Sequence, residues 1–162
     1  MKYRVMLDTS FLISLADANR PNHVTAEKFI RYFMEKQIPI LFSTIVASEF
    51  GIVQPVTDLP LHMFEILPFN MPHACKAADL DFSIYREATD QRNVVKDDFK
   101  LIAQAQEEQV SHILTEDART LARYCERLRV DGKIAVNAVK LVDGFDVSHF
   151  EGGQKVLAIE AT

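Results

Sequence analysis

The sequence lacks the features that mark secreted, membrane-spanning or zinc-binding proteins. It contains only two cysteines, Cys75 and Cys125, and because both fall in helical patterns we interpret them as buried thiols of a protein in the reducing cytoplasm. No apolar run is long enough to span a membrane, and no signal peptide opens the chain. The five histidines are scattered at spacings that do not suit a zinc site. These absences favour a cytoplasmic globular protein without a membrane partner.

A net positive charge is also missing, because the formal net charge is −5, which does not indicate nucleic-acid binding. Basic residues are nevertheless concentrated locally. Arg119, Arg123 and Arg127 repeat every four residues and predict a stripe on one helix face. Lys100 belongs to a second basic group. Such a stripe is usually solvated surface, and the alternative is a track that binds phosphate groups.

The order of apolar and polar segments predicts an α/β protein. Its 162 residues, 48% of them hydrophobic, suit one domain with a sizeable core. Short apolar runs predict strands at Tyr3–Leu7, Ile38–Phe42, Glu65–Pro68, Ser111–Leu114 and Ile134–Val136. Amphipathic segments predict the longer helices at Thr25–Lys36, Pro72–Tyr85, Asp97–Gln109 and Ala118–Arg129. This alternation is typical of a three-layer α/β/α protein with helices on both faces of a mostly parallel sheet.

Four acidic residues carry most of the chemical information. Each lies where an apolar run meets a helix start, or on the apolar side of a helix, and they are Asp8, Glu49, Asp98 and Asp117. Carboxylates avoid such positions unless something pairs with them, and no basic residue stands at helical spacing on the same faces. A bound divalent cation would explain all four positions together.

Asp8 and Glu49 each follow a predicted strand. Asp8 lies at the carboxyl end of the first strand, the edge where open parallel sheets bind ligands, although it also has the position of a helix cap. Glu49 shares one helix face with the apolar residues three and four positions to either side, which are Ile45, Val46, Ile52 and Val53. The alternative for Glu49 is a surface residue whose stem packs and whose carboxylate reaches solvent.

Asp98 and Asp117 belong to the second half of the chain. Asp98 begins the inward stripe of a predicted helix, whereas Asp97 is rotated off the stripe and fits an N-cap or a first-turn charge. Asp117 follows a short apolar strand, and Glu116 is the competing carboxylate at that junction. For Asp98 and Asp117 alike, the alternative is a stabilising charge at a helix N-terminus.

Four segments, taken in order, resemble the PIN domain. They are Leu-Asp-Thr-Ser-Phe-Leu from Leu7, Ser-Thr-Ile-Val-Ala-Ser-Glu-Phe from Ser43, Asp-Phe-Lys-Leu-Ile-Ala-Gln-Ala from Asp98 and Leu-Thr-Glu-Asp from Leu114. The chain is most similar to the VapC-type toxin ribonucleases of bacteria and archaea, from about Met6 to about Leu121. Asn70 departs from the pattern, because many members have an acidic residue there. We therefore expect a single PIN-like domain over residues 1–162, with a core at 1–130 and the last strand and a C-terminal tail at 131–162.

The resemblance implies a ribonuclease that depends on Mg²⁺ or Mn²⁺ and hydrolyses RNA phosphodiester bonds with activated water. Carried over residue by residue, the catalytic and metal-binding carboxylates are Asp8, Glu49, Asp98 and Asp117. The hydroxyls that match ligand- or water-orienting positions are those of Thr9, Ser10 and Thr115. In the basic segments the candidate RNA contacts are Arg119, Arg123 and Lys100. Hard cations of this kind prefer oxygen ligands, which fits the acidic set.

The resemblance also implies the toxin of a type II toxin–antitoxin pair, which forms a homodimer and is blocked by an antitoxin protein. The antitoxin tail of such pairs lays apolar side chains in a groove and sends an arginine toward the carboxylates, where a guanidinium can displace the cation. Candidate groove residues are Phe11, Phe50 and the helix Thr25–Lys36. The alternative is that both aromatic residues belong to the core.

Other interpretations stay open. A receiver-like phosphoacceptor domain would need an adjacent acidic pair early in the chain and a lysine after a late strand, and neither is present. A haloacid-dehalogenase-like phosphatase would need a second aspartate two residues after Asp8, where this chain has Ser10. A non-catalytic PIN-like module that binds RNA or protein would lose one or more of the acids, but all four positions are filled. A housekeeping RNA-processing PIN nuclease would have the same acids without an antitoxin.

Overall fold

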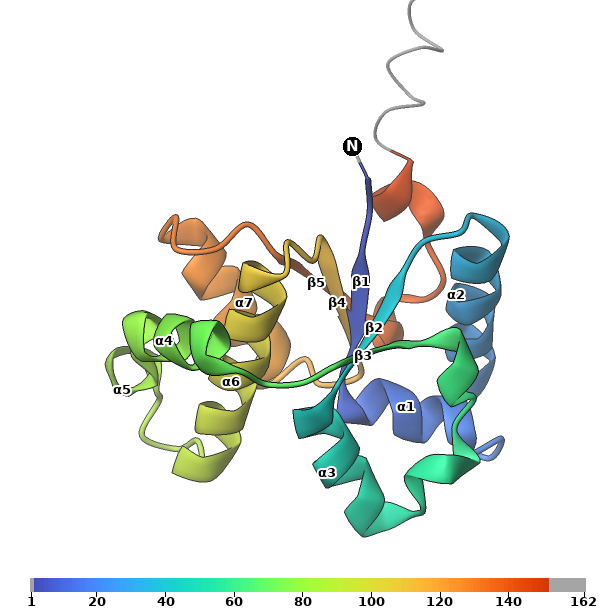
Figure 1. Cartoon of the computed structure of the whole chain (residues 1–162), viewed down its shortest axis with the longest axis horizontal. Helices are drawn as coiled ribbons and strands as arrows, with labels where there is room; N and C mark the ends of the chain where they lie inside the picture. The colour runs from blue at the N-terminus through green and yellow to red at the C-terminus, as the bar shows by residue number, and fades with distance from the viewer. Residues whose placement is uncertain (1, 152–162) are drawn as a thin grey trace, which may run out of the picture.

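A parallel β-sheet forms the centre of the computed structural model, which describes residues 2–151. Its strands are β1 (Val5–Leu7), β2 (Ile40–Ser43), β3 (Glu65–Leu67), β4 (His112–Thr115) and β5 (Asn137–Lys140). Their order is β3-β2-β1-β4-β5, and every neighbouring pair is parallel. The carboxyl ends of β1, β2 and β4 therefore meet at one edge of the sheet (Figure 1). The predicted α/β class with a mostly parallel sheet is confirmed.

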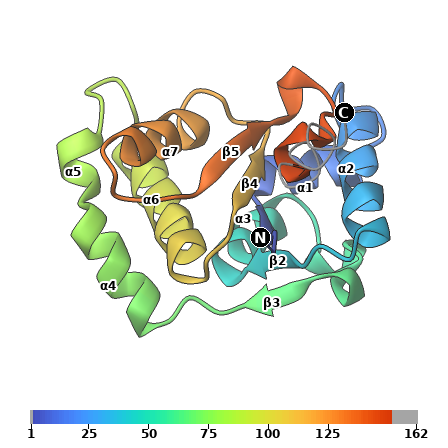
Figure 2. The ribbon, with the colours of Figure 1, turned by 90° about the horizontal axis from the view of Figure 1, so that it is seen from above.

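Helices cover both faces of this sheet (Figure 2). On one side lie α1 (Thr9–Ala16) and α2 (His23–Glu35). On the other side lie α4 (Met71–Leu80), α5 (Phe82–Tyr85), α6 (Arg92–Glu107) and α7 (Leu121–Val130). Helix α3 (Thr44–Val53) continues directly from β2 and extends away from the carboxyl edge of the sheet. Short 3₁₀ turns lie at Val56–Asp58, Leu61–Met63, Leu141–Asp143 and Val147–Phe150. The layers match the predicted α/β/α arrangement.

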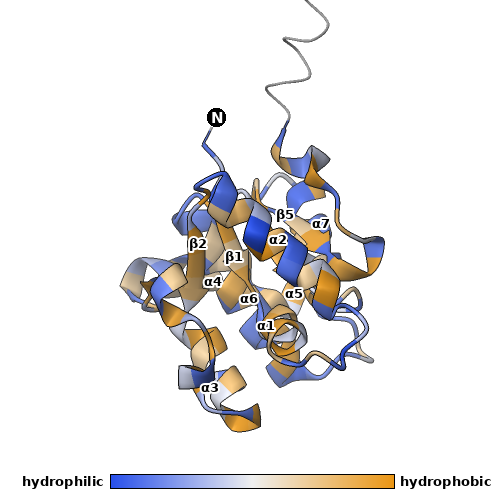
Figure 3. Cartoon of the chain, turned by 90° about the vertical axis from the view of Figure 1, so that its right-hand side faces the viewer, coloured by the Kyte–Doolittle hydropathy of each residue, from blue (hydrophilic) through white to orange (hydrophobic). Residues whose placement is uncertain are grey.

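The inner strands are apolar because helices cover them on both sides. Every residue of β1, β2 and β4 is buried. The edge strand β3 differs, since Glu65 and Ile66 are exposed. Figure 3 shows inner strands in orange shades behind α2, whose ribbon carries both blue and orange residues, as an amphipathic helix does. The polar residues at the carboxyl edge therefore stand on a rigid, fully packed support.

The last strand begins three residues later than predicted. We expected Ile134–Val136, but β5 pairs with β4 over Asn137–Lys140. Both apolar ends of the predicted segment are buried in the connection that leads into the strand. The backbone N–H between them, that of Ala135, donates to the side chain of Gln106 at 2.8 Å rather than to a strand. The prediction was wrong because it took the burial of a connecting segment for strand formation, whereas the edge strand itself has only one buried residue.

The helix predicted at Pro72–Tyr85 is two helices. Asp81 separates them, because its positive φ of 49° ends α4 in the left-handed region. The Asp81 carboxylate then accepts from the backbone N–H of Ser83 at 3.2 Å and caps α5. An aspartate tolerates this conformation better than most residues, so it both ends one helix and starts the next.

Two helix starts also differ from the prediction. Helix α6 begins at Arg92, five residues before the expected Asp97, so that both Asp97 and Asp98 lie in its second turn. The effect of a helix dipole fades within the first turn, so this position removes the helix-terminus explanation for Asp98. Helix α7 begins at Leu121 rather than Ala118, because the preceding residues form a turn.

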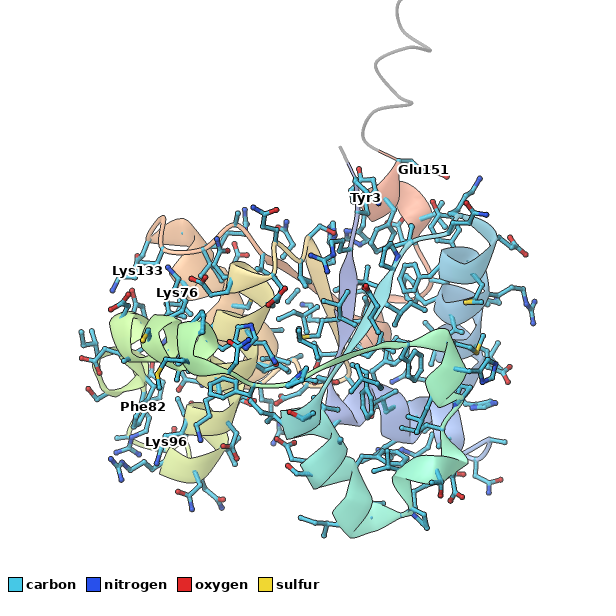
Figure 4. All side chains as sticks on the ribbon, viewed as in Figure 1. Tyr3, Lys76, Phe82, Lys96, Lys133 and Glu151 are labelled. Carbon is cyan, nitrogen blue, oxygen red and sulfur yellow. The ribbon has the colours of Figure 1, made fainter. Side chains whose placement is uncertain are left out.

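The segment after β5 packs on α2 through aromatic rings. Phe145 makes an edge-to-face contact with Phe29 at 5.0 Å between ring centroids, and Phe150 makes one with Phe33 at 5.2 Å. Tyr3 contacts Phe150 in the same way, and Figure 4 shows Tyr3 near Glu151 at the end of the molecule opposite α3. This segment starts where β5 ends, and by Glu151 it has reached the end of the molecule opposite α3.

The cysteine prediction is half right. Cys125 is buried, and burial raises the pKa of its thiol to about 12. Cys75 is exposed on α4, which corrects the prediction of two buried thiols. Within residues 2–151 no helix is long and apolar enough to cross a lipid bilayer.

Candidate active site

A cavity of about 250 Å³ opens at the carboxyl edge of the sheet, between α1, α3, α6 and the turn before α7. All four predicted carboxylates line it, and Asp97 lines it as well. Its other walls are the polar residues Thr9 and Ser10 and the apolar residues Ile13, Val46, Val94, Leu101 and Leu121. Residues from distant parts of the chain, from position 8 to position 121, thus meet in one acidic hollow.

Asp8 lines the cavity and caps α1 at the same time. Its Oδ1 accepts from the backbone N–H of Phe11 and from the hydroxyl of Ser10, both at 2.8 Å. Its Oδ2 accepts from the hydroxyl of Thr115. Burial raises the pKa of Asp8 to about 6, although these hydrogen bonds oppose the rise. The two roles considered for Asp8 are therefore compatible in one side chain.

Glu49 reaches the cavity from α3. The hydroxyl of Thr9 donates to its Oε2 at 2.7 Å, and burial is the main cause that raises its pKa. The predicted apolar face around it is only partly correct. Val46 is buried, but Ile52 is 87% exposed because the far end of α3 extends beyond the sheet. Glu49 therefore stands between the packed root of α3 and its exposed end.

Asp98 is the carboxylate with the least protein support. Its Oδ2 is buried and has no hydrogen-bond partner among the described residues. Burial raises the pKa of Asp98 to about 8; the nearby hydroxyl of Thr120 opposes this, and the charges of Asp117, Asp8 and Glu49 add to it. A buried carboxylate oxygen without a partner is costly, and it points to a ligand that completes its coordination.

Asp117, rather than Glu116, faces the cavity. Backbone N–H groups of Arg119 and Thr120 donate to Asp117 Oδ1 at 2.9 and 3.0 Å. Burial alone would raise the pKa of Asp117, but these hydrogen bonds, together with the Thr120 hydroxyl, hold it below its usual value. Glu116 instead accepts from Asn22 Nδ2 at 2.8 Å. The turn before α7 thus separates the two neighbouring carboxylates.

The hydroxyl residues Ser10 and Thr115 hold the acidic segments in register. Thr115 is fully buried behind the cavity, where its hydroxyl donates to Asp8 and accepts from the backbone N–H of Asp117 at 2.8 Å. Ser10 accepts from the backbone N–H of Glu116 at 2.9 Å. These bonds fix the end of β1 against the end of β4. In this structure the hydroxyls orient carboxylates and backbone.

Asp97 is a cavity residue that the sequence analysis missed. We expected it to cap a helix, but it lies on the same face of α6 as Val94, Asp98 and Leu101. These positions have the i, i+3, i+4, i+7 spacing of one helix face. The signal was therefore present, and it was lost because the helix was predicted to start at Asp97. The charge of Asp97 also contributes to the raised pKa of Glu49.

None of the candidate RNA contacts lines the cavity. Arg123 forms an ion pair with Asp90, and Lys100 lies 3.8 Å from Asp97. Arg119 stands in the turn before α7, so it does not share a helix face with Arg123. Arg127 pairs with Glu87 at 2.6 Å. Part of the positive charge noted in the sequence is thus neutralised on the surface of α7.

The donor set fits Mg²⁺ or Mn²⁺. Among residues 2–151 no three His, Cys, Asp or Glu side chains converge on a single ion position. Mg²⁺, however, keeps several waters and is commonly held by one or two protein carboxylates. The unpartnered Oδ2 of Asp98 and the cluster of oxygen donors around it meet that requirement. Since the cavity contains no histidine or cysteine, the site does not suit Zn²⁺.

Comparison with known proteins identifies the family. The model of the PIN domain matches residues 5–127, so the chain belongs to the PIN domain family. The match spans β1 to α7 and includes every carboxylate of the cavity. A search of curated proteins gave no significant match.

Solved structures with a similar fold come from bacterial toxin–antitoxin systems. The chain resembles one in VapBC2 from Rickettsia felis bound to a promoter DNA fragment, with a TM-score of 0.54 and 15% identity over 84% of this chain and 97% of that one. It resembles Mycobacterium tuberculosis VapC20, a sarcin-ricin loop cleaving toxin, with a TM-score of 0.53 and 14% identity over 82% and 98%. A chain of DNA-bound VapBC from Salmonella typhimurium gives 0.53 and 15% identity over 86% and 98%. At this identity the likeness shows the fold.

Proposed function

We propose that this PIN domain protein is an endoribonuclease that depends on Mg²⁺ or Mn²⁺ and hydrolyses RNA phosphodiester bonds. The observation that carries the proposal is the buried, unpartnered Oδ2 of Asp98 in a cavity with four further carboxylates. Without a metal ion, the nearby like charges destabilise the folded protein. Such a cluster is typical of a functional site that binds a cation. Family membership supports a nuclease, and one protein of similar fold, VapC20, is a sarcin-ricin loop cleaving toxin.

The cavity carboxylates have different proposed roles, which follow from their different surroundings. The candidate metal ligands are Asp8, Glu49, Asp98 and Asp117. One or two of them would bind the cation directly and the others would bind its coordinated waters. The cation would stabilise charge that develops on the phosphate and lower the pKa of a coordinated water. Asp8 and Asp117 are fixed by hydrogen bonds and so provide rigid anchors. Asp98, whose pKa is raised to about 8, would have to be deprotonated in order to act as a ligand. Glu49 is oriented by a hydrogen bond from the hydroxyl of Thr9, which belongs to α1.

Cleavage of RNA by the purified protein tests the proposal. The protein should cleave RNA with Mg²⁺ or Mn²⁺ and stop when EDTA is added. Asp98→Asn should lower the rate on the order of 100-fold or more, because it weakens metal binding. Asp79→Asn, on the exposed surface of α4, should leave the rate unchanged. Full activity of Asp98→Asn would contradict the assignment.

We further propose that the protein is the toxin of a type II toxin–antitoxin pair and forms a homodimer. VapBC complexes with similar folds support the antitoxin partner. A guanidinium of the antitoxin can bridge two carboxylates of the cavity and displace the cation. The exposed apolar residues Ile52 and Val53 on α3 are candidates for contact between two copies, because they are 87% and 59% exposed.

The structure corrects the candidate groove for the antitoxin. Phe11 and Phe50 are fully buried in the core, so neither lines an open groove. Helix α2 does line one, a hollow of about 590 Å³ against the turns after α3. Its apolar lining is Leu15, Ala16, Ile30, Met34, Leu59, Pro60 and Met63, and its charged rim is Glu27, Arg31 and Asp58. An amphipathic antitoxin segment fits this combination.

Co-expression with the product of a neighbouring small gene tests the pair. The chain alone should arrest growth and cleave RNA, and the neighbour should bind it and restore growth. A harmless chain with an inert neighbour would instead favour a housekeeping RNA-processing nuclease. Analytical ultracentrifugation of the wild type and of Ile52→Asp tests the dimer, which the added charge should dissociate.

A further inference from the structure

Gln104 is a buried polar residue on the core side of α6. It is fully buried, as is its neighbour Ala105, and Leu101 one turn earlier is also buried. An unpaired amide there would be costly, but both of its polar groups are satisfied. Its Oε1 accepts from the hydroxyl of Ser43, and its Nε2 donates to the carbonyl oxygen of Leu67 at 3.2 Å. A single side chain thus joins α6 to the ends of β2 and β3.

The partner hydroxyl lies at the root of α3. Ser43 is fully buried and caps this helix, since its hydroxyl oxygen accepts from the backbone N–H of Ile45 at 3.1 Å. The same hydroxyl donates to Gln104. The hydrogen bond between Ser43 and Gln104 therefore connects the first turn of α3 with α6, two helices that form different walls of the acidic cavity.

The spacing along the two helices is matched. Glu49 follows Ser43 by six residues and Asp98 precedes Gln104 by six, a distance of about 9 Å along a helix axis in each case. Both carboxylates line the cavity. Helices α3 and α6 are thus two arms that are joined at one level and bear acidic residues at another (Figure 1).

Repulsion between the acids acts to spread these arms whenever Asp98 is deprotonated, as a metal ligand must be. The charge of Glu49 acts on Asp98, and that of Asp97 acts on Glu49. The far end of α3 offers little resistance, because Ile52 and Val53 are exposed rather than packed. The buried hydrogen bond between Ser43 and Gln104 joins the N-terminus of α3 to α6. Such a bond fixes the separation of the two helices more strictly than apolar contacts, along which helices can shift.

We propose that Gln104 is a positioning residue for the metal site, whose amide holds α6 against Ser43 and Leu67 so that Glu49 and Asp98 stay close enough to act on one cation. This inference rests on the proposed metal-dependent function. Gln104 lines no part of the cavity and acts only through the two helices. A neutral amide suits this task, because it supplies both a donor and an acceptor without adding charge near the acids.

Calorimetric titration of the RNA-free protein with Mn²⁺ tests the inference. Gln104→Met keeps the length of the side chain and removes both hydrogen bonds. Its Mn²⁺ affinity should fall about 10-fold or more, as it does when a residue that orients metal ligands without contacting the metal is replaced. Gln106→Met is the matched control, because Gln106 lies on the same helix but accepts from Ala135, away from the cavity. Its Mn²⁺ affinity should equal that of the wild type.

The outcomes separate the two levels of the proposal. If Gln104→Met binds Mn²⁺ as tightly as the wild type, Gln104 has no positioning role, although the metal site itself stands. An equal loss of Mn²⁺ affinity in Gln104→Met and Gln106→Met would also overturn the role of Gln104. A wild-type protein that binds no Mn²⁺ would overturn the proposed function as well. If Gln104→Met does not fold, Ser43→Ala decides the question, with Ser43→Thr as the variant that keeps the hydroxyl. Ser43→Ala should weaken Mn²⁺ binding and Ser43→Thr should restore it, and equal affinity of the two would refute the link.

Discussion

Thr115, at the end of β4, donates its hydroxyl proton to Asp8, at the end of β1. The two residues are separated by 107 positions in the sequence, yet their strands pair directly in the sheet. The bond favours the charged form of Asp8, whose burial favours the neutral form. A side chain that never faces the cavity therefore helps to set the charge of one that does.

Thr115→Val should shift the pH dependence of RNA cleavage. Removing the hydroxyl removes an interaction that lowers the pKa of Asp8, so this pKa should rise by roughly one unit, which corresponds to about 1.4 kcal/mol. The acidic limb of the pH–rate profile should move to higher pH by a similar amount. Thr115→Ser keeps the hydroxyl and should retain the wild-type profile. Coincident profiles for all three proteins would show that this hydrogen bond does not tune Asp8.

Metal-free protein should lose stability as the pH rises from about 4 to about 8. The pKa of Asp98 is about 8 in the folded protein against 3.8 ordinarily, so the folded state binds more protons in this range. The free energy of unfolding therefore falls with increasing pH as Asp98 loses its preferred proton. At pH 8, Asp98→Asn should melt higher than the wild type by on the order of 5 °C, which corresponds to about 2 kcal/mol.

Thermal unfolding in EDTA across this pH range provides the measurement. Asp98→Asn should also show a flatter dependence on pH than the wild type, because an amide does not titrate. Saturating Mn²⁺ should raise the melting temperature of the wild type more than that of the variant. A variant with the same pH dependence and the same response to Mn²⁺ as the wild type would exclude Asp98 from the site.

Asp97→Asn should weaken metal binding less than Asp98→Asn. Both side chains line the cavity, but Asp97 is 48% exposed and lies 3.8 Å from Lys100. Asp98 instead has a buried, unpartnered oxygen. We expect about a 3-fold loss of Mn²⁺ affinity for Asp97→Asn, and roughly 10-fold or more for Asp98→Asn, by calorimetry. The reverse order would mean that Asp97 is the principal ligand on α6.

Met34→Glu should weaken binding of the proposed antitoxin without affecting RNA cleavage. Met34 is 46% exposed in the α2 groove, so a buried charge there opposes an apolar partner. The affinity of the Met34→Glu variant for the antitoxin should fall about 10-fold or more. Met71→Glu is the control, because Met71 is 73% exposed on α4 in the opposite helical layer. Equal binding by both variants would place the partner elsewhere.

Local signals were sufficient to predict the residues at the strand ends. Asp8 and Asp117 follow apolar strands, and in a parallel sheet such junctions lie together at one edge. Thr9 and Ser10 could be predicted in the same way, because they begin the helix that follows β1. The order of strands and helices followed from the same alternation of patterns. These predictions depended on a few consecutive residues and on one general property of parallel sheets.

Features that depend on distant packing were not predicted. The start of α6 gives no capping signal, since Gln91 makes no side-chain hydrogen bond at that position. Gln104 resembles a surface residue in the sequence, and its partner Ser43 lies 61 positions away. The exposure of Ile52 depends on how far α3 extends beyond the sheet, which its own apolar pattern does not encode. Each of these features was decided by a neighbour from another part of the chain.

The order of the acidic residues along the chain determines when the cavity is completed during synthesis. Asp8 and Glu49 come from the first half of the chain, whereas Asp98 and Asp117 arrive with α6 and the turn after β4. A nascent chain that has emerged only as far as β3 therefore holds two of the five cavity carboxylates, and β1 still lacks its second neighbour. Domains fold largely as units as they leave the ribosome. The proposed nuclease would thus stay inert beside the ribosome's own RNA until nearly all of its polypeptide has been made.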